Sequence, residues 1–396
     1  MSFISQTLAV TAMNLRNIPR RLGNSLVIVI GIAGAVGEFI PILALSISFR
    51  ATIEGDGSDN RAIVLTQRAT AETESSLTRE EVATIMDYPQ VMRDSRGRPV
   101  VSSEVVLVAP VSRKRDHTDV NVTFRGVSGQ YFAMRPELKL RSGRMFESGK
   151  QELIVGAGAI SQFDGLEIGE IIRLQDGDWK VVGTFAGGNG ARESEVVADA
   201  LTVMSAYKLN SFHSLTVALR SPRELAAFKH TVELGSKSIL SARGEPEYLA
   251  TASESVNRML RLVGYSIGSI MALGALFSAL NSMYSAVAAR SVEMATLRAL
   301  GFSSLAVAGG VLFEAFLLAF TGAAIGAAFA CALFNGATIS TLGGAVWDSQ
   351  LVYSLSITPA LAIGVALLAC ALGLAGGLLP AIRAARANIA EALHET

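Results

Sequence analysis

The stretch of this chain that comes closest to a catalytic motif runs from Gly143 to Gln151 and has the outline of a phosphate-binding loop. Such a loop needs four residues between its two glycines, then a Lys, and then a Ser or Thr whose hydroxyl reaches Mg²⁺. Here five residues separate Gly143 from Gly149, and Gln151 follows Lys150. We therefore expect no ATP site, no catalytic residue, and no cofactor or metal bound by this chain.

Two other residue types that often carry chemistry are sparse. Cys331 and Cys370 both fall within apolar runs, which indicates buried apolar side chains and not a disulfide or a thiolate metal site. His117 and His213 are isolated and far apart in the sequence. We expect both histidines to lie at the surface and not to act as ligands.

Two acidic residues, Glu38 and Glu314, stand inside strongly apolar stretches. A charge at the centre of a bilayer costs roughly 2.5–3.5 kcal/mol on insertion scales, so such residues usually face protein or water. For each of them two interpretations are open. One is a polar contact that stabilises one conformational state, and the other is a protonated or snorkelling side chain.

One charged segment between apolar stretches is predicted to form a short helix over residues 290–300, stopped by Gly301. Ser291 is its expected N-cap. Glu293 would lie near the positive N-terminal end of the helix dipole and Arg298 near the negative C-terminal end. A short amphipathic helix of this kind suits docking into a groove on a partner protein, although a plain connector between two helices would have the same pattern.

The elements that must position these residues are membrane helices. Of the 396 residues 50% are hydrophobic and the mean hydropathy is +0.41, which indicates a membrane protein. The formal net charge is zero, so no basic field favours nucleic acid. Patterns of small residues, as in Gly322–Gly326 and Gly373–Gly377, allow close helix packing within the chain or between two copies. Four apolar stretches are long enough to span a bilayer, at about 24–49, 262–287, 304–334 and 357–380.

The arginines predict the orientation, because cytoplasmic loops carry an excess of cations. The loop 335–356 contains no Lys or Arg. Both termini and the loop 288–303 are therefore expected on the cytoplasmic side, and the segment 50–261 outside. A cleaved signal peptide at the first stretch is the alternative, but the apolar run exceeds the 7–15 residues of a signal core. The flanking cations are Arg16, Arg20 and Arg21 before the first stretch, Arg290 and Arg298 between the second and third, and Arg383 and Arg386 after the fourth.

The segment 50–261 has the pattern of a folded α+β domain. Capping-box sequences predict helix starts at Thr78–Glu81 and at Ser221–Glu224. Between these two helices, about 130–208 is expected to be a strand-rich insertion. Two short features are expected within it, a hairpin turn at Asp176-Gly177 and an exposed glycine-rich loop at Gly187–Gly190.

The charged segment resembles the coupling segment of the MacB/FtsX-like family of ABC transporter permeases, whose pattern is roughly Arg-x-x-Glu-Ile-x-x-Leu-Arg-Ala-Leu-Gly. The matching residues are Arg290, Glu293, Leu297, Arg298, Ala299, Leu300 and Gly301, with Met294 in place of Ile. The C-terminal stretches Leu379–Arg386 and Glu391–Leu393 resemble the closing pattern of the family. Three further stretches, Gly126–Phe132, Gly143–Phe146 and Val181–Gly183, resemble its MacB-type periplasmic core.

The resemblance implies a membrane α-helical fold with four transmembrane helices and a large α+β extracytoplasmic domain between the first and the second. It divides the chain into an N-terminal amphipathic helix with the first span at 1–49, a MacB-type core at 50–261, and an FtsX-like permease domain at 262–396. It also implies that Arg290, Glu293, Met294, Leu297, Arg298 and Gly301 couple to an ATPase. In that role Glu293 and Arg298 would make polar contacts and Met294 and Leu297 would fill the ATPase's groove, while Glu314 matches a Glu often found at this depth.

The partners implied by the resemblance are a separate cytoplasmic ABC ATPase that binds ATP and Mg²⁺, a second permease chain and a periplasmic adaptor. Lipid of the cell inner membrane would surround the spans. The expected function is export driven by mechanotransmission, in which ATP-driven movement of the coupling helix changes the shape of the outer domain. Two alternatives stay open, namely extraction of lipoprotein or lipid from the outer leaflet, and a non-transporting relay to a cell-wall hydrolase.

Overall fold

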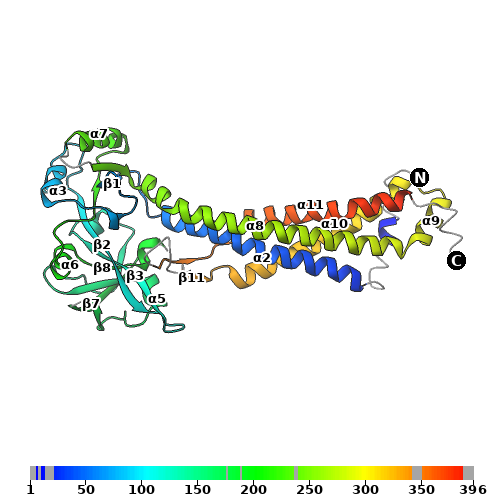
Figure 1. The fold of residues 1–396 in the computed structure, drawn as a ribbon, viewed down its shortest axis with the longest axis horizontal. Coiled ribbons are helices and arrows are strands. Elements are labelled where there is room, and N and C mark those ends of the chain that lie inside the picture. The colour runs from blue at the N-terminus through cyan, green and yellow to red at the C-terminus, as the bar shows by residue number, and fades with distance from the viewer. Residues whose placement is uncertain are drawn as a thin grey trace. The chain divides into compact units, whose positions relative to one another are not determined.

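The computed structural model describes residues 6–7, 10–13, 22–174, 177–187, 190–235, 240–340 and 350–386 (Figure 1). These residues divide into two compact units. The first, which we call the helical unit, lies within Met1–Ile47, Met259–Ala337 and Leu355–Thr396. The second, the sheet unit, lies within Ser48–Arg258 and Thr338–Ser354.

Four helices of the described chain are long and apolar enough to cross a membrane, as the sequence predicts. Helix α2 runs further than the predicted first stretch, because the helical hydrogen bonding continues to Glu54. Helix α8 begins at Glu245, well before the predicted 262, since its polar first turns still form regular helix with acids at the N-terminal end. The four helices are α2 (Leu22–Glu54), α8 (Glu245–Ala288), α10 (Ser304–Phe334) and α11 (Pro359–Arg386).

Close packing in the helical unit depends on small residues. A Cβ added at Gly326 of α10 would lie 2.4 Å from the carbonyl oxygen of Ala33 in α2. One added at Gly373 of α11 would lie 2.3 Å from the Ala319 Cβ in α10. The small-residue patterns thus serve contacts within the chain, where they bring α2, α10 and α11 together.

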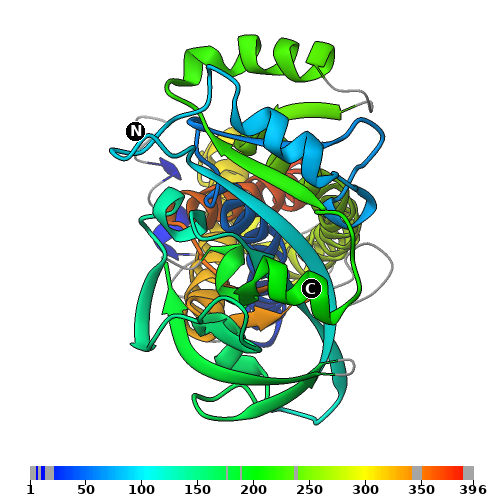
Figure 2. The same ribbon diagram turned by 90° about the vertical axis from the view of Figure 1, so that its left-hand side faces the viewer.

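The sheet unit contains ten described strands in the order β10-β1-β9-β2-β3-β8-β5-β7-β4, with β6 paired to β7. Most of these strands, coloured cyan to green, are seen in Figure 2. Most pairs are antiparallel, but β3 pairs with β8 and β5 with β7 in parallel. The strands are β1 (Arg61–Thr66), β2 (Val101–Ser112), β3 (Asp119–Val127), β4 (Lys139–Gly143), β5 (Glu152–Gly156), β6 (Ile171–Leu174), β7 (Gly177–Ala186), β8 (Val196–Asp199), β9 (Ser214–Ala218) and β10 (Leu240–Gly244).

Short helices connect these strands. They are α3 (Arg79–Met86), α4 (Tyr131–Met134), α5 (Ala157–Gln162), α6 (Ala200–Ala206), α7 (Leu225–Gly235) and the 3₁₀ turns η2 (Glu72–Glu74), η3 (Ala191–Ser194) and η4 (Pro222–Glu224). A second sheet pairs β11 (Thr338–Ser340) with β12 (Val352–Ser354). The main core lies around Trp179 and Phe124, whose rings meet edge to face with centroids 5.1 Å apart.

The two predicted capping boxes and the predicted hairpin can be compared with the structure. Thr78 and Glu81 form the predicted capping box at the start of α3. Ser221 also caps its helix, but the first turn is the 3₁₀ helix η4. The predicted hairpin exists as the β6–β7 pair, although Asp176 itself lies outside the described residues.

One expectation about exposure in the sheet unit is wrong, and another lies partly outside the described residues. Gly187 and Gly190, the described ends of the glycine-rich loop, are half-buried and pack against Leu138 and Asp56, while 188–189 lie outside the described residues. His213 is also half-buried, and its Nδ1 makes a hydrogen bond with the backbone of Val106. His117 is exposed as expected.

Candidate functional site

The predicted coupling segment forms helix α9 (Ser291–Ala299). Ser291 is its first residue and not its N-cap, because Arg290 occupies the cap position and makes no side-chain cap bond. The C-terminal end matches the expectation, since Gly301 has a φ of +95° that glycine adopts without strain. The Gly301 N–H donates to the Arg298 carbonyl and the Phe302 N–H to that of Leu297, both at 3.1 Å, which forms a Schellman motif.

Arg290 and Glu314 form one buried ion pair, which their separate positions in the sequence do not indicate. The Arg290 Nη2 lies 2.6 Å from the Glu314 Oε1, and the two residues are only 6% and 3% exposed. A short, charge-assisted hydrogen bond of this kind compensates much of the cost of burying each charge. Glu314 therefore makes a polar contact in the structure. The pair joins the beginning of α9 to α10.

Helix α9 has a buried and an exposed side. Met294 and Ala295 are buried, and Leu297 is half-buried. Met294 and Leu297 line a small cavity within the helical unit, together with Val307 and Val311 of α10. Met294 is thus largely used in packing within this chain, whereas Leu297 keeps part of its surface exposed. We define the exposed face of α9 as Val292, Glu293, Thr296, Ala299 and Leu300.

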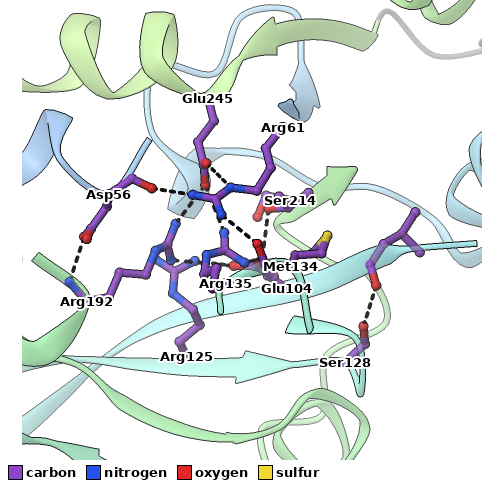
Figure 3. Close-up of polar contacts among 12 residues, drawn as sticks. Asp56, Arg61, Glu104, Arg125, Ser128, Met134, Arg135, Arg192, Ser214 and Glu245 are labelled. Carbon is purple, nitrogen blue, oxygen red and sulfur yellow. Dashed lines mark hydrogen bonds and ion pairs between the residues drawn. The ribbon is translucent and has the colours of Figure 1, made fainter. Parts of the chain in front are cut away.

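A second charged cluster, in the sheet unit, was not anticipated from the sequence. Arg125 of β3 donates to three carboxylates at 2.7–3.0 Å, those of Glu72, Glu104 and Glu195. These residues are at most 9% exposed. We call the whole group the buried ionic cluster (Figure 3), and its charged members are Asp56, Arg61, Glu72, Glu104, Arg125, Arg135, Arg192, Glu195 and Glu245.

The environment of the buried ionic cluster shifts the pKa values of its acids in different directions. Burial would raise the pKa of Glu72, but the charge and hydrogen bonds of Arg125 outweigh it and lower that pKa to about 2. Burial likewise opposes the ionisation of Glu245, yet its arginine neighbours, Arg135 first, lower its pKa. Asp56 is the exception, since burial dominates over the nearby Arg192 and raises its pKa.

Comparison with known proteins matches both parts of the chain. A family model for the MacB-like periplasmic core domain matches residues 25–233, and one for the FtsX-like permease C-terminal region matches residues 265–389. The chain belongs to the MacB/FtsX-like family of ABC transporter permeases. The prediction of the family and of its fold is confirmed, and the chain is a multi-pass membrane protein.

Individual relatives are distant. The chain is 24% identical over 302 residues to a macrolide export ATP-binding/permease protein MacB of Neisseria gonorrhoeae (strain ATCC 700825 / FA 1090), a match that covers 70% of this chain and 44% of the relative. A second MacB of Neisseria gonorrhoeae matches with the same values. The chain thus spans less than half the length of these relatives.

Among solved structures, the extracellular domain of the noncanonic ABC-type transporter YknZ from Gram-positive bacteria matches with 16% identity and a TM-score of 0.36. That match covers 46% of this chain and 100% of the other. The periplasmic region of MacB from Actinobacillus actinomycetemcomitans matches with 14% identity and a TM-score of 0.38, over 53% of this chain and 95% of the other.

Within this permease, the predicted site residues fall into two groups. Arg290, Met294 and Glu314 are buried together around the N-terminal half of α9, whereas Glu293 is exposed and also lines the same small cavity. Arg298 is half-buried near the end of α9. Glu38 lies apart, exposed on α2, and the described residues provide it with no ion pair. The sequence features that could have indicated the buried ionic cluster are single charged residues within strands, such as Glu104 in β2 and Arg125 in β3.

Proposed function

We propose that this chain is the permease subunit of an export system, in which a separate cytoplasmic ABC ATPase docks on α9 and drives a conformational change in the sheet unit. The observation that carries this proposal is the arrangement of α9. The helix lies between two membrane helices in the sequence and presents an exposed face. Its N-cap residue Arg290 is bonded to Glu314 of α10 in the interior of the helical unit. A plain connector needs neither an exposed apolar face nor a buried ion pair.

The exposed face of α9 supplies the chemistry of docking. Leu300 is 73% exposed and Val292 is 39% exposed, so both are available to fill apolar pockets of a partner. Glu293 lies beside them and can accept from a basic residue of the ATPase. This assignment moves the apolar docking contacts from Met294 and Leu297 to Val292 and Leu300.

The ion pair and the packing of α10 would carry a displacement of α9 into the spans. A movement of α9 without α10 would separate Arg290 from Glu314 and leave two buried charges without partners. Helix α10 in turn packs closely on α2 and α11 at Gly326 and Gly373. The docked ATPase would therefore move these helices together, and α2 continues directly into the sheet unit.

The remaining partners follow from the same proposal. Both chain ends and α9 would lie on the cytoplasmic side of the inner membrane, and the sheet unit outside, where a periplasmic adaptor would meet it. A second permease chain would complete the transporter. Glu38, exposed on an apolar helix, is a candidate contact with that second chain.

A specific observation supports lipid or lipoprotein extraction as a second candidate function. The helical unit contains an apolar groove of about 500 Å³ between α2, α8 and α11. Val36, Phe39, Tyr265, Leu361 and Leu368 are among its lining residues. A groove of this size and character suits an acyl chain.

The proposal is tested by reconstituting the chain in lipid nanodiscs with the ABC ATPase that co-purifies with it. We expect no ATP hydrolysis by the chain alone, and stimulated hydrolysis by the complex. Leu300→Asp should abolish the stimulation, because it places a charge in an apolar contact. Leu234→Asp is the matched control, since Leu234 is 74% exposed but lies in the sheet unit. Equal stimulation by both variants would contradict docking on α9.

A further inference from the structure

The segment Gly190–Glu195, which we call the hub segment, is unusually buried for its composition. It contains the 3₁₀ turn η3 and carries two acids, an arginine and a serine. Arg192, Glu193, Ser194 and Glu195 are nevertheless only 2–8% exposed. Charged residues are almost never buried to this degree unless they are paired. The partners of the hub segment therefore indicate what it does.

The first partner is the end of α2. Asp56 follows this helix closely, and its Oδ2 accepts a hydrogen bond from the backbone N–H of Arg192 at 3.0 Å. The approach is so close that a Cβ on Gly190 would lie 1.8 Å from the Asp56 Oδ1. Any larger residue at position 190 would push the Asp56 carboxylate away from its donor.

The second partner is the beginning of α8. Glu245 is the first residue of that helix and is 2% exposed. Its Oε1 lies 3.8 Å from the Nη2 of Arg192 and 3.0 Å from the Nη2 of Arg135. Its other oxygen pairs with Arg61. Arg192 thus contacts Asp56, just after α2, through its backbone N–H, and Glu245, at the start of α8, through its guanidinium.

The third partner is β12, which belongs to the segment that follows α10 in the sequence and precedes α11. The Ser194 hydroxyl donates to the Val352 carbonyl at 3.1 Å and accepts from the Val352 N–H at 2.8 Å. One hydroxyl has the donor and the lone pairs to do both. Both groups are buried, so neither bond has water as an easy substitute.

The hub segment is also part of the sheet. The Glu195 carboxylate accepts from the Nε of Arg125 in β3 at 2.8 Å, and the Glu195 carbonyl accepts from the Gly156 N–H at 3.0 Å. Glu195 leads directly into β8, which lies between β3 and β5. A displacement of the hub segment is therefore a displacement of the middle of the sheet.

We propose that the hub segment is the common joint that positions the sheet in response to movement of α2, α8 and β12. This inference rests on the proposed function, because it assumes that those connections move. Each of the three is bonded to the hub segment through a buried polar or charged group. None of them can shift alone without separating such a group from its partner, which is unfavourable in a buried environment. The hub segment consequently favours a concerted shift of all three.

Several contacts among the described residues bypass the hub segment, and the test must separate them from it. One is a hydrogen bond from the Ser58 N–H, just after α2, to the Glu245 carboxylate at 3.2 Å. The Phe49 ring in α2 meets the Tyr353 ring in β12 edge to face, with centroids 5.8 Å apart. Arg61 bonds the Asp56 carbonyl as well as Glu245. The beginning of α8 is the informative reporter for a change made at Ser194, since the bonds of the hub segment are the direct route between them.

The experiment measures hydrogen–deuterium exchange of the full chain in lipid nanodiscs. Ser194→Ala removes the two bonds to Val352, and we expect several-fold faster exchange in residues 350–354 and also in 245–256, with α3 unchanged. Ser161→Ala is the matched control, because its hydroxyl bonds only the nearby Gly158 carbonyl and is exposed. Tyr353→Leu loosens β12 without removing a bond of the hub segment, and should leave 245–256 unchanged.

Three outcomes would overturn the inference. One is faster exchange in 350–354 alone, which would mean that the connections are anchored independently. Another is a uniform increase that includes α3, as expected for general destabilisation of the domain. The third is an equal response of 245–256 to Tyr353→Leu, which would place the route through Phe49.

A second experiment adds the ATPase and separates this inference from the proposed function. In the wild-type complex ATP should change exchange in the sheet unit. Gly190→Ala should keep the ATPase stimulation and lose that change, while Gly129→Ala, whose added Cβ meets open space, should keep both. A wild-type complex without an ATP-dependent change contradicts the proposed function, and the first experiment then decides on the hub segment alone. An unaltered change in Gly190→Ala contradicts the hub segment.

Discussion

The guanidinium of Arg290 and the carboxylate of Glu314 lie 2.6 Å apart in the interior of the helical unit, 24 residues apart in the sequence. The pair connects the N-cap residue of α9 to a residue inside the apolar helix α10. Both residues belong to elements that the proposed ATPase would move. The pair therefore links the start of α9 to α10, and this has consequences for single and double substitutions.

Glu314→Gln and Arg290→Gln should each destabilise the helical unit by about 3–5 kcal/mol, because each leaves one buried charge without its partner. The double variant Arg290→Leu/Glu314→Leu should be closer to wild type than either single variant, since it removes both charges together. Thermal unfolding in detergent measures this order. Single and double variants that lose stability additively would show that the two side chains do not interact.

The proposed orientation predicts which introduced cysteines react with an impermeant thiol reagent in spheroplasts. Ser148 and Thr296 are suitable positions because both are exposed, whereas Ser194 is 2% exposed and unsuitable. In a background with Cys331 and Cys370 replaced by Ala, the cysteine at 148 should react and the one at 296 should react only after lysis. Labelling at 296 in intact spheroplasts would reverse the topology.

Signals that depend on neighbouring residues were predictable from the sequence. The four apolar stretches, the Thr78 capping box and the Gly301 helix stop all depend on a few consecutive residues. The 3.6-residue period of α9 likewise predicts an amphipathic helix. It does not predict which side faces inward, because that depends on how α10 packs, and the structure buries Met294 beside residues of α10.

The buried ionic cluster shows what the sequence could not provide. Arg125 meets Glu72 and Glu195, which lie 53 and 70 positions away. These distances become contacts only through the strand order of the sheet, in which β3 lies beside β8. A lone charge in an apolar strand indicates a buried partner, but it does not identify that partner.

The stability of the sheet unit should fall in acid in a way that depends on Glu72. Its pKa is about 2 in the folded chain against an ordinary 4.5, because Arg125 outweighs the effect of burial. A lowered folded-state pKa stabilises above the ordinary value, and this stabilisation, about 3 kcal/mol, is lost as the pH falls from about 4.5 towards 2. Asp56 has a raised pKa, so its contribution to stability changes with pH in the opposite direction. The effect of Glu72 is therefore isolated by comparing the wild type with a variant that lacks the Glu72 carboxylate.

The quantity to compare is the free energy of unfolding of the wild type and of Glu72→Gln, measured by urea unfolding at several pH values from 3 to 6. The buried Trp179 reports on the sheet unit when Trp347 is replaced by Phe. We expect Glu72→Gln to be less stable than wild type at pH 6 and the gap to narrow steadily towards pH 3. A gap that is constant over this range would mean that Glu72 does not titrate as its environment predicts.

The two sides of α9 should respond differently to truncation. Met294→Ala removes a buried side chain from the cavity that it shares with α10, and should cost about 2–5 kcal/mol of stability. Val292→Ala, on the exposed face of the same helix, should change stability by less than about 0.5 kcal/mol.

In the complex, Val292→Ala should instead weaken ATPase docking by about 1 kcal/mol or more, visible as a higher half-saturating concentration of ATPase. Unfolding curves and ATPase titrations of the two variants, side by side, separate the roles. If Val292→Ala lowers stability while Met294→Ala weakens docking alone, then α9 is rotated about its axis from the position described, and Met294 belongs to the docking surface after all.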